Sequence, residues 1–185
     1  MSLQSWQETL ITSQVDGAAV TAAAATSLLP AAAKYTLPAN FFSVIGKQKR
    51  VQASGRISSV ITTPGTARFD VRFGATVVFD GLAVLLDSVV GHTTVGWILD
   101  ILLTCRAIGA TGNLMGQGLW TSEDILGVPA TPPKGVLSAI LPWNSTPAVG
   151  NNFDTTATQQ VDLFFTQTAA TGSCTCHQYS LISLN

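Results

Sequence analysis

WILDILLTCRAIG, residues 97–109, is the most strongly apolar segment of the chain whose residues also alternate. Every second residue from Trp97 to Cys105 is apolar, which predicts a long β-strand with one face on a core. The opposite face mixes charged, polar and aliphatic side chains: Ile98, Asp100, Leu102, Thr104 and Arg106. Such a face is too apolar for open solvent and too charged for a core. We therefore expect it to be partly covered, for example by another subunit.

The low charge of the chain is its most informative bulk property. Only 10% of the 185 residues are charged, against about 25% in typical soluble domains. Soluble monomers normally keep a charged surface, so this composition predicts that part of the surface is buried in an assembly. A β-domain with a neutral surface is the alternative. The net charge of −1, with nine thinly spread lysines and arginines, argues against nucleic acid as the main partner.

Further apolar or alternating segments surround the central strand and are separated by turn residues: 45–61, 67–74, 76–79, 82–86, 112–123, 159–167 and 174–184. The segment 112–123 is expected to be the antiparallel partner of residues 97–109. Many short strands without a convincing helix predict an all-β fold, namely a jelly-roll β-sandwich of about eight strands.

Three local features are expected within these segments. In residues 67–74 the aromatic and aliphatic positions should face the core, and the alternate positions should be solvated: Arg68, Asp70 and Arg72. Asp80-Gly81 should form a hairpin turn between 76–79 and 82–86. Gly116 and Gly118 should leave room for a bulky side chain, for example Trp97.

The chain is expected to divide at residue 40. Residues 1–40 contain an alanine-rich run and two prolines and predict an extended N-terminal arm, whereas residues 41–185 form the sandwich domain. Residues 127–152 contain five prolines and predict a long irregular loop that serves as a contact surface. The candidate assembly contacts are apolar residues of this loop and of the mixed face of the central strand: Ile98, Leu102, Leu137, Ile140, Leu141 and Trp143.

No motif in the sequence predicts catalysis, a cofactor or a metal. Cys174 and Cys176 share one face of the last strand and His177 lies on the other, which is unsuitable for one tetrahedral ion. No nucleophile signature accompanies His92 or His177. Three cysteines without framework spacing fit a protein that folds in a reducing cytoplasm. The first basic residue is Lys34 and the alanine-rich run is short, so we expect neither a signal peptide nor a membrane span.

Four segments, in this order, resemble virion structural proteins of tailed bacteriophages: ASGRISSVITTPGT (53–66), DVRFG (70–74), ILLTCRAIGATGNLMGQGLWTSE (101–123) and HQYSL (177–181). These segments define strands rather than an active site, so no functional residue is carried over. The resemblance implies a non-enzymatic, jelly-roll-type decoration or cement protein. Such proteins are commonly homotrimers that sit on the major capsid protein at the surface of the virion, and they are made in the host cytoplasm.

Two alternatives stay open for the function. One is a tail or baseplate component that recognises host glycan, and the other is a non-viral carbohydrate-binding module. In either case Trp120, Trp143 and Tyr179 would stack on sugar rings. Specific sugar binding would favour these alternatives over a cement protein.

Overall fold

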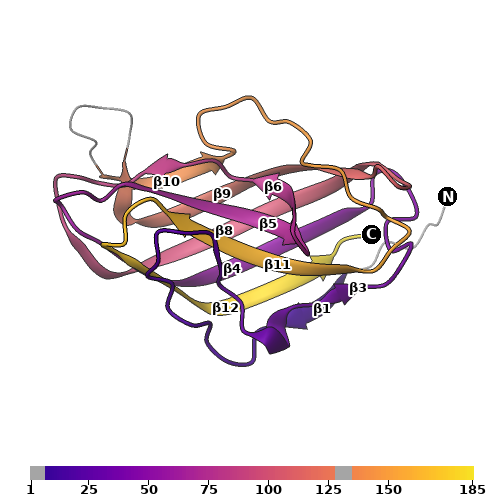
Figure 1. Ribbon diagram of the computed structural model, residues 1–185, viewed down its shortest axis with the longest axis horizontal. Coiled ribbons are helices and arrows are strands. Elements are labelled where there is room, and N and C mark those ends of the chain that lie inside the picture. The colour runs from indigo at the N-terminus through magenta and orange to yellow at the C-terminus, as the bar shows by residue number, and fades with distance from the viewer. Residues whose placement is uncertain (1–6, 128–134) are drawn as a thin grey trace.

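The computed structural model is a sandwich of two antiparallel β-sheets, shown in Figure 1, and it describes residues 7–127 and 135–185. Sheet A contains, in spatial order, β1 (Glu8–Thr12), β12 (Ser173–Ser183), β4 (Gln48–Ser59), β8 (His92–Ala107), β9 (Asn113–Gly127) and β10 (Gly135–Leu141). Sheet B contains β2 (Thr26–Ser27), β11 (Gln159–Gln167), β5 (Thr66–Phe73) and β6 (Thr76–Asp80), with β3 (Thr36–Leu37) paired to β11 and β7 (Val84–Leu85) paired to β5.

The central strand predicted from residues 97–109 is β8, which lies in the middle of sheet A between β4 and β9. Its alternation is confirmed, because the residues from Trp97 to Cys105 that were expected to face the core are buried, whereas Ile98 and Leu102 are exposed. The antiparallel pairing of β8 with β9 is also confirmed, over a register that opposes Leu99 to Trp120.

The core between the sheets is centred on aromatic rings. Phe69 of β5 contacts Trp97 at 5.0 Å, Trp120 at 4.8 Å and Phe165 at 5.3 Å between ring centroids. Rings at such separations contribute beyond the area that they bury. Both tryptophans of sheet A therefore serve the core and hold the two sheets together.

The expected room beside Gly116 exists, but Phe79 of β6 fills it rather than Trp97. A Cβ placed on Gly116 would lie 2.2 Å from the ring of Phe79, which real side chains do not tolerate. The glycine therefore lets sheet B approach sheet A closely at this position.

The two-sheet, all-β sandwich is confirmed, and the expected number of about eight strands was too low, because the described residues alone form twelve. The pairs β4–β12 and β5–β11 join early strands to late ones, as in a jelly roll, whereas β8, β9 and β10 form a meander within sheet A. The jelly-roll connectivity as a whole stays a prediction. No helix in residues 7–127 and 135–185 is long and apolar enough to cross a membrane.

The hairpin expected at Asp80-Gly81 is wrong. Strands β6 and β7 each pair with β5 and not with one another. Gly81 donates its backbone N–H to the carbonyl of Phe69 at 2.9 Å, so the chain continues along β5 instead of reversing. The tight turn lies one strand earlier, at Gly74, whose φ of +56° favours glycine.

The irregular loop expected over residues 127–152 is interrupted by strand β10, which pairs with β9. Within β10, Ala139 and Leu141 are buried while Ser138 and Ile140 are exposed, so the period of two is that of an ordinary half-buried strand. The prediction for residues 128–134 lies outside the described residues. Leu141 is part of the core and is fully buried within the chain, and the assembly contact expected of it stays a prediction.

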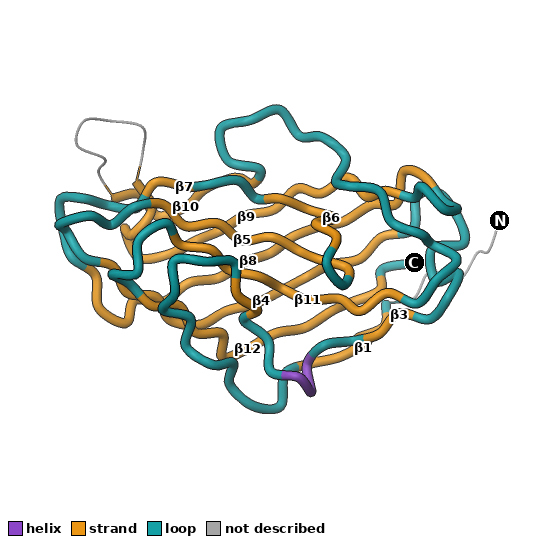
Figure 2. The backbone as a smooth tube through the Cα atoms, in the orientation of Figure 1, coloured by secondary structure: helices purple, strands orange, loops and turns teal. Residues whose placement is uncertain are grey.

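Residues 7–40 lie along the sandwich and contribute strands to both sheets. Strand β1 pairs with β12, and β2 and β3 pair with β11. Val20, Leu28 and Leu29 are buried in the core. Figure 2 shows this part of the chain as mostly loop, with one 3-10 turn at Ala31–Ala33. The division of the chain at residue 40, and contact of an arm with a neighbouring subunit, stay predictions.

Candidate functional site

The outer face of sheet A carries a patch of branched aliphatic side chains, which we call the apolar face. Its members come from three neighbouring strands and are 40–69% exposed: Ile98 and Leu102 of β8, Leu119 of β9, and Leu137 and Ile140 of β10. Asp100, Leu119 and Ile140 lie opposite one another in the strand register, so the three strands present one continuous surface. Contiguous exposed apolar patches of this kind mark interaction sites in soluble proteins.

One ion pair borders the apolar face. Arg50 of β4 donates from Nε to Oδ1 of Asp100 at 2.8 Å, and its Nη2 contacts the second carboxylate oxygen. These hydrogen bonds lower the pKa of Asp100 and raise the pKa of Arg50. The two charges neutralise each other locally, so the face has little net charge to oppose an apolar partner.

The structure brings together four of the six predicted contact residues: Ile98, Leu102, Leu137 and Ile140. Trp143 lies apart from them, half-buried against the core, and donates its backbone N–H to the carbonyl of Gly81 at 2.8 Å. Leu119 belongs to the apolar face and was missed. The alternation of residues 112–123 places Leu119 opposite Trp120, and that signal could have identified it.

An open hollow of about 740 Å³ adjoins the apolar face at the other end of the same strands. Ile98 and Leu137 form its apolar wall, and Arg56, Glu123 and His177 supply polar groups. Glu123 Oε1 accepts a 2.9 Å hydrogen bond from the backbone N–H of Gly96. A Cβ on Gly96 would lie only 2.8 Å from Arg56 Nη1, so the glycine permits these charged side chains to lie over the sheet.

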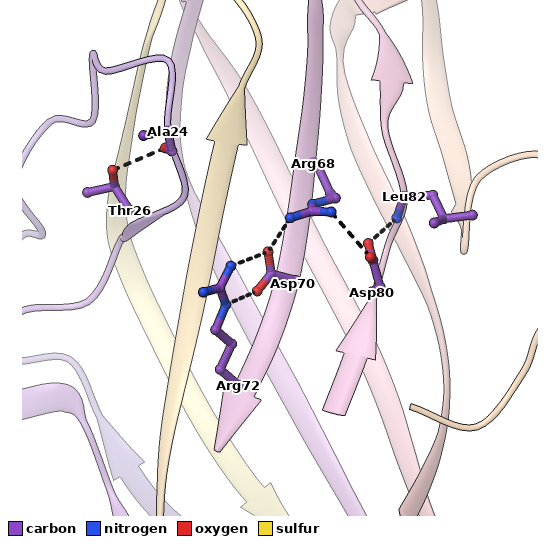
Figure 3. Close-up of polar contacts among 7 residues, drawn as sticks. All are labelled: Ala24, Thr26, Arg68, Asp70, Arg72, Asp80 and Leu82. Atoms are coloured by element: carbon purple, nitrogen blue, oxygen red, sulfur yellow. Dashed lines mark hydrogen bonds and ion pairs between the residues drawn. The ribbon is translucent and has the colours of Figure 1, made fainter. Parts of the chain in front are cut away.

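The outer face of sheet B carries a network of ion pairs, shown in Figure 3. Asp70 accepts hydrogen bonds from Arg72 at 2.5 and 3.2 Å and lies 3.5 Å from Arg68, which in turn bonds Asp80 at 3.2 Å. The hydrogen bond to Asp70 raises the pKa of Arg72. The expectation that Asp70 is solvated is wrong, because the two arginines cover a fully buried side chain.

The cysteines and histidines form no obvious catalytic group. Cys174 and Cys176 face the core and His177 lies on the opposite side, where its Nδ1 is 3.0 Å from Asp16 Oδ1, so the predicted faces are confirmed. Burial raises the pKa of Cys176 to about 11, which keeps the thiol protonated and unreactive at neutral pH. Within the described ranges, no three His, Cys, Asp or Glu side chains cluster to hold a metal ion.

Two of the three aromatic residues expected to stack on sugars are not available for that role. Trp120 and Tyr179 are buried in the core. Trp143 is half-buried, as are Tyr35 and Phe164. In the part of the chain that the structure describes, no aromatic side chain is as open to solvent as the aliphatic residues of the apolar face.

Comparison with known proteins assigns no family to this chain. No protein-family model matches the sequence, and no curated protein matches it either. Among solved structures, the chain is similar to the CBM2 module of the evolved Dit of Lactobacillus casei BL23 phage J-1. The two chains are 8% identical with a TM-score of 0.34, and the match covers 82% of this chain and 69% of the other. A likeness this weak carries no argument about function.

Proposed function

We propose that this protein is a non-enzymatic structural subunit of a bacteriophage particle that binds its neighbours through the apolar face. The observation that carries the proposal is the apolar face itself: five exposed branched aliphatic residues on three adjacent strands. A chain with only 10% charged residues is poorly equipped to keep such a surface in water. The sequence resemblance to virion structural proteins is the reason for placing the subunit in a bacteriophage particle.

In this role the subunit decorates the outside of the capsid and contacts the major capsid protein and copies of itself. The binding site for this subunit exists only on the assembled shell. Each bound copy therefore shifts the equilibrium towards the assembled shell and stabilises it by mass action. Burying aliphatic side chains provides the free energy, at about 25 cal/mol per Å² of apolar surface. The resemblance implies that these copies form a homotrimer, and the role proposed here does not depend on that number of copies.

The proposal is tested with a variant in which three residues of the apolar face are made polar: Ile98→Gln, Leu102→Gln and Leu119→Gln. Its matched control changes three aliphatic residues elsewhere that are 58–63% exposed: Val15→Gln, Val44→Gln and Ile45→Gln. Co-sedimentation with assembled phage shells should be lost in the first variant and retained in the control. Equal binding by both variants would remove the apolar face from the proposal.

A second candidate function, recognition of host glycan by a baseplate component, is favoured by the hollow beside the apolar face. Arg56, Glu123 and His177 offer charged and polar groups around an open space large enough for a saccharide. A glycan array with the purified protein tests it directly. Specific binding that disappears in Glu123→Gln would support glycan recognition, whereas an array without signal, together with shell binding, would leave the capsid role.

A further inference from the structure

In the described residues the two sheets have four edges, formed by β1, by β2 with β3, by β6 with β7, and by β10, and the first three are protected against pairing with another strand. Strand β1 is short, contains the charged Glu8 and has a register shift between Thr9 and Ile11. Strand β2 has only two residues. The edge of β6 is covered, because Asn151 donates its backbone N–H to the carbonyl of Val77 at 3.1 Å. Short length, charge, bulges and covering segments are the usual protections of sheet edges.

Strand β10 is the exception. Figure 1 shows it at the edge of sheet A opposite to β1. Its sequence, GVLSAIL, contains neither a charge nor a proline, and after a register shift between Val136 and Ser138 it pairs regularly with β9 as far as Leu141. Within the described residues, no hydrogen bond connects the outer side of β10 to another segment. An uncharged strand of this length with a free edge is a template for pairing with another strand.

We propose that β10 pairs antiparallel with β10 of a second copy of this chain, so that two copies of sheet A join into one sheet. Pairing about a two-fold axis uses the same strand twice and closes after two copies. Since β10 has no charged residue, no like charges meet at the axis. Leu137 and Ile140, which are 62% and 69% exposed, gain apolar neighbours from the partner.

This pairing would also join the apolar faces of the two copies. A two-fold axis that relates antiparallel strands of one sheet runs perpendicular to that sheet, so the outer faces of both copies point to the same side. Because Ile140 and Leu119 lie opposite one another in the register, the two apolar faces become continuous across the axis. The inference goes beyond the proposed function and does not depend on a place in the virion. It assigns two copies to the edge contact, in place of the homotrimer that the resemblance implies.

The experiment compares two variants that add the same charge at different places. Ser138→Lys places a lysine on the exposed edge strand, and Leu102→Lys places one on β8, two strands away from the edge. Light scattering should give about twice 19.3 kDa for the unmodified protein and for Leu102→Lys, and the monomer mass for Ser138→Lys. Circular dichroism confirms that both variants fold.

Hydrogen exchange of the unmodified protein provides a second readout that needs no substitution. Backbone amides of β10 should exchange at least about tenfold more slowly in the associated protein than at concentrations where it is monomeric, while those of β1 stay unchanged.

A monomer at all concentrations, or a trimer that Ser138→Lys leaves intact, would overturn the edge pairing. If Leu102→Lys alone dissociates the protein, association runs through the apolar face, which overturns this inference while supporting the proposed function.

Discussion

The outer faces of the two sheets differ in how their side chains are satisfied. On sheet B, Arg68, Arg72, Asp70 and Asp80 bond one another, and Lys34 pairs with Asp162 at 2.7 Å. The outer surface of sheet A carries five exposed aliphatic residues, beside the ion pair between Arg50 and Asp100 and the polar side chains around the hollow. The chain has therefore paired six of its few charges on sheet B, whereas sheet A exposes a patch of aliphatic side chains.

The difference separates a surface that the chain completes by itself from one that it leaves incomplete. Every charge named on sheet B has a partner within the same chain, so that face gains nothing further from a protein neighbour. The aliphatic residues of sheet A gain free energy only when something covers them. The contrast is therefore the reason to propose sheet A as the side of the molecule that binds a partner.

The largest expected effect separates the two sides of β10. Leu141→Ala should lower the free energy of unfolding by about 3 kcal/mol, because it leaves a cavity in the core. Ile140→Ala, one residue earlier on the exposed side, should change it by less than about 0.5 kcal/mol. Urea unfolding at a concentration where the protein is monomeric measures both values. Equal costs would mean that β10 does not alternate as described and that Ile140 is not part of the apolar face.

The next prediction makes the same substitution on both faces. Asp70→Asn should lower the free energy of unfolding by about 2 kcal/mol, because it removes the fully buried carboxylate between Arg68 and Arg72. The cost is reduced by the partial exposure of the arginines. Asp100→Asn is the matched control and should cost about 0.5 kcal/mol or less, since Arg50 and Asp100 are both substantially exposed. A cost for Asp100→Asn as large as that for Asp70→Asn would contradict the contrast between the faces.

The strands that could be predicted from the sequence are those with a long, strict alternation. Strands β8 and β9 have 16 and 15 residues, so their period of two is repeated often enough to decide both the strand and its buried face. Strand β10 has only seven residues, and the prolines on either side of it favour a loop in any local interpretation. Strand β10 is extended because it pairs with β9. Pairing between strands depends on residues elsewhere in the chain, so the local sequence of β10 does not reveal it.

The candidate site was predictable where it depended on alternation alone. Ile98 and Leu102 were identified because the alternation of β8 places these two aliphatic residues on the face of the strand that points away from the core. Asp70 was misjudged because alternation predicts which face a side chain takes but not what covers it there. Arg68 and Arg72 lie two residues away on the same face and close over the carboxylate, and only the three-dimensional structure shows this.

The smallest expected effect concerns a charge on the inner side of sheet A. Lys49 of β4 is buried, with its Nζ in contact with Ser183 Oγ and 4.2 Å from the ring centre of Phe41. Burial, with a further contribution from Lys47, lowers the pKa of Lys49 to about 7. Between pH 7 and 10.5 the unfolded chain therefore binds more protons than the folded one, and stability rises with pH across this range. Below pH 7 the folded protein bears the full cost of a buried ammonium group.

Lys49→Met should accordingly raise the free energy of unfolding by about 1 kcal/mol at pH 6. The gain is smaller than the pKa shift alone implies, because the contacts with Phe41 and Ser183 are lost. The variant should also lose most of the increase in stability between pH 7 and 10 that the unmodified protein shows. Urea unfolding of both proteins at pH 6 and pH 10 measures these differences, and an unchanged pH dependence would refute the buried charge. Confirmation would sharpen the contrast between the sheets, because sheet A would then hold a cation that burial destabilises, whereas the charges named on sheet B are paired.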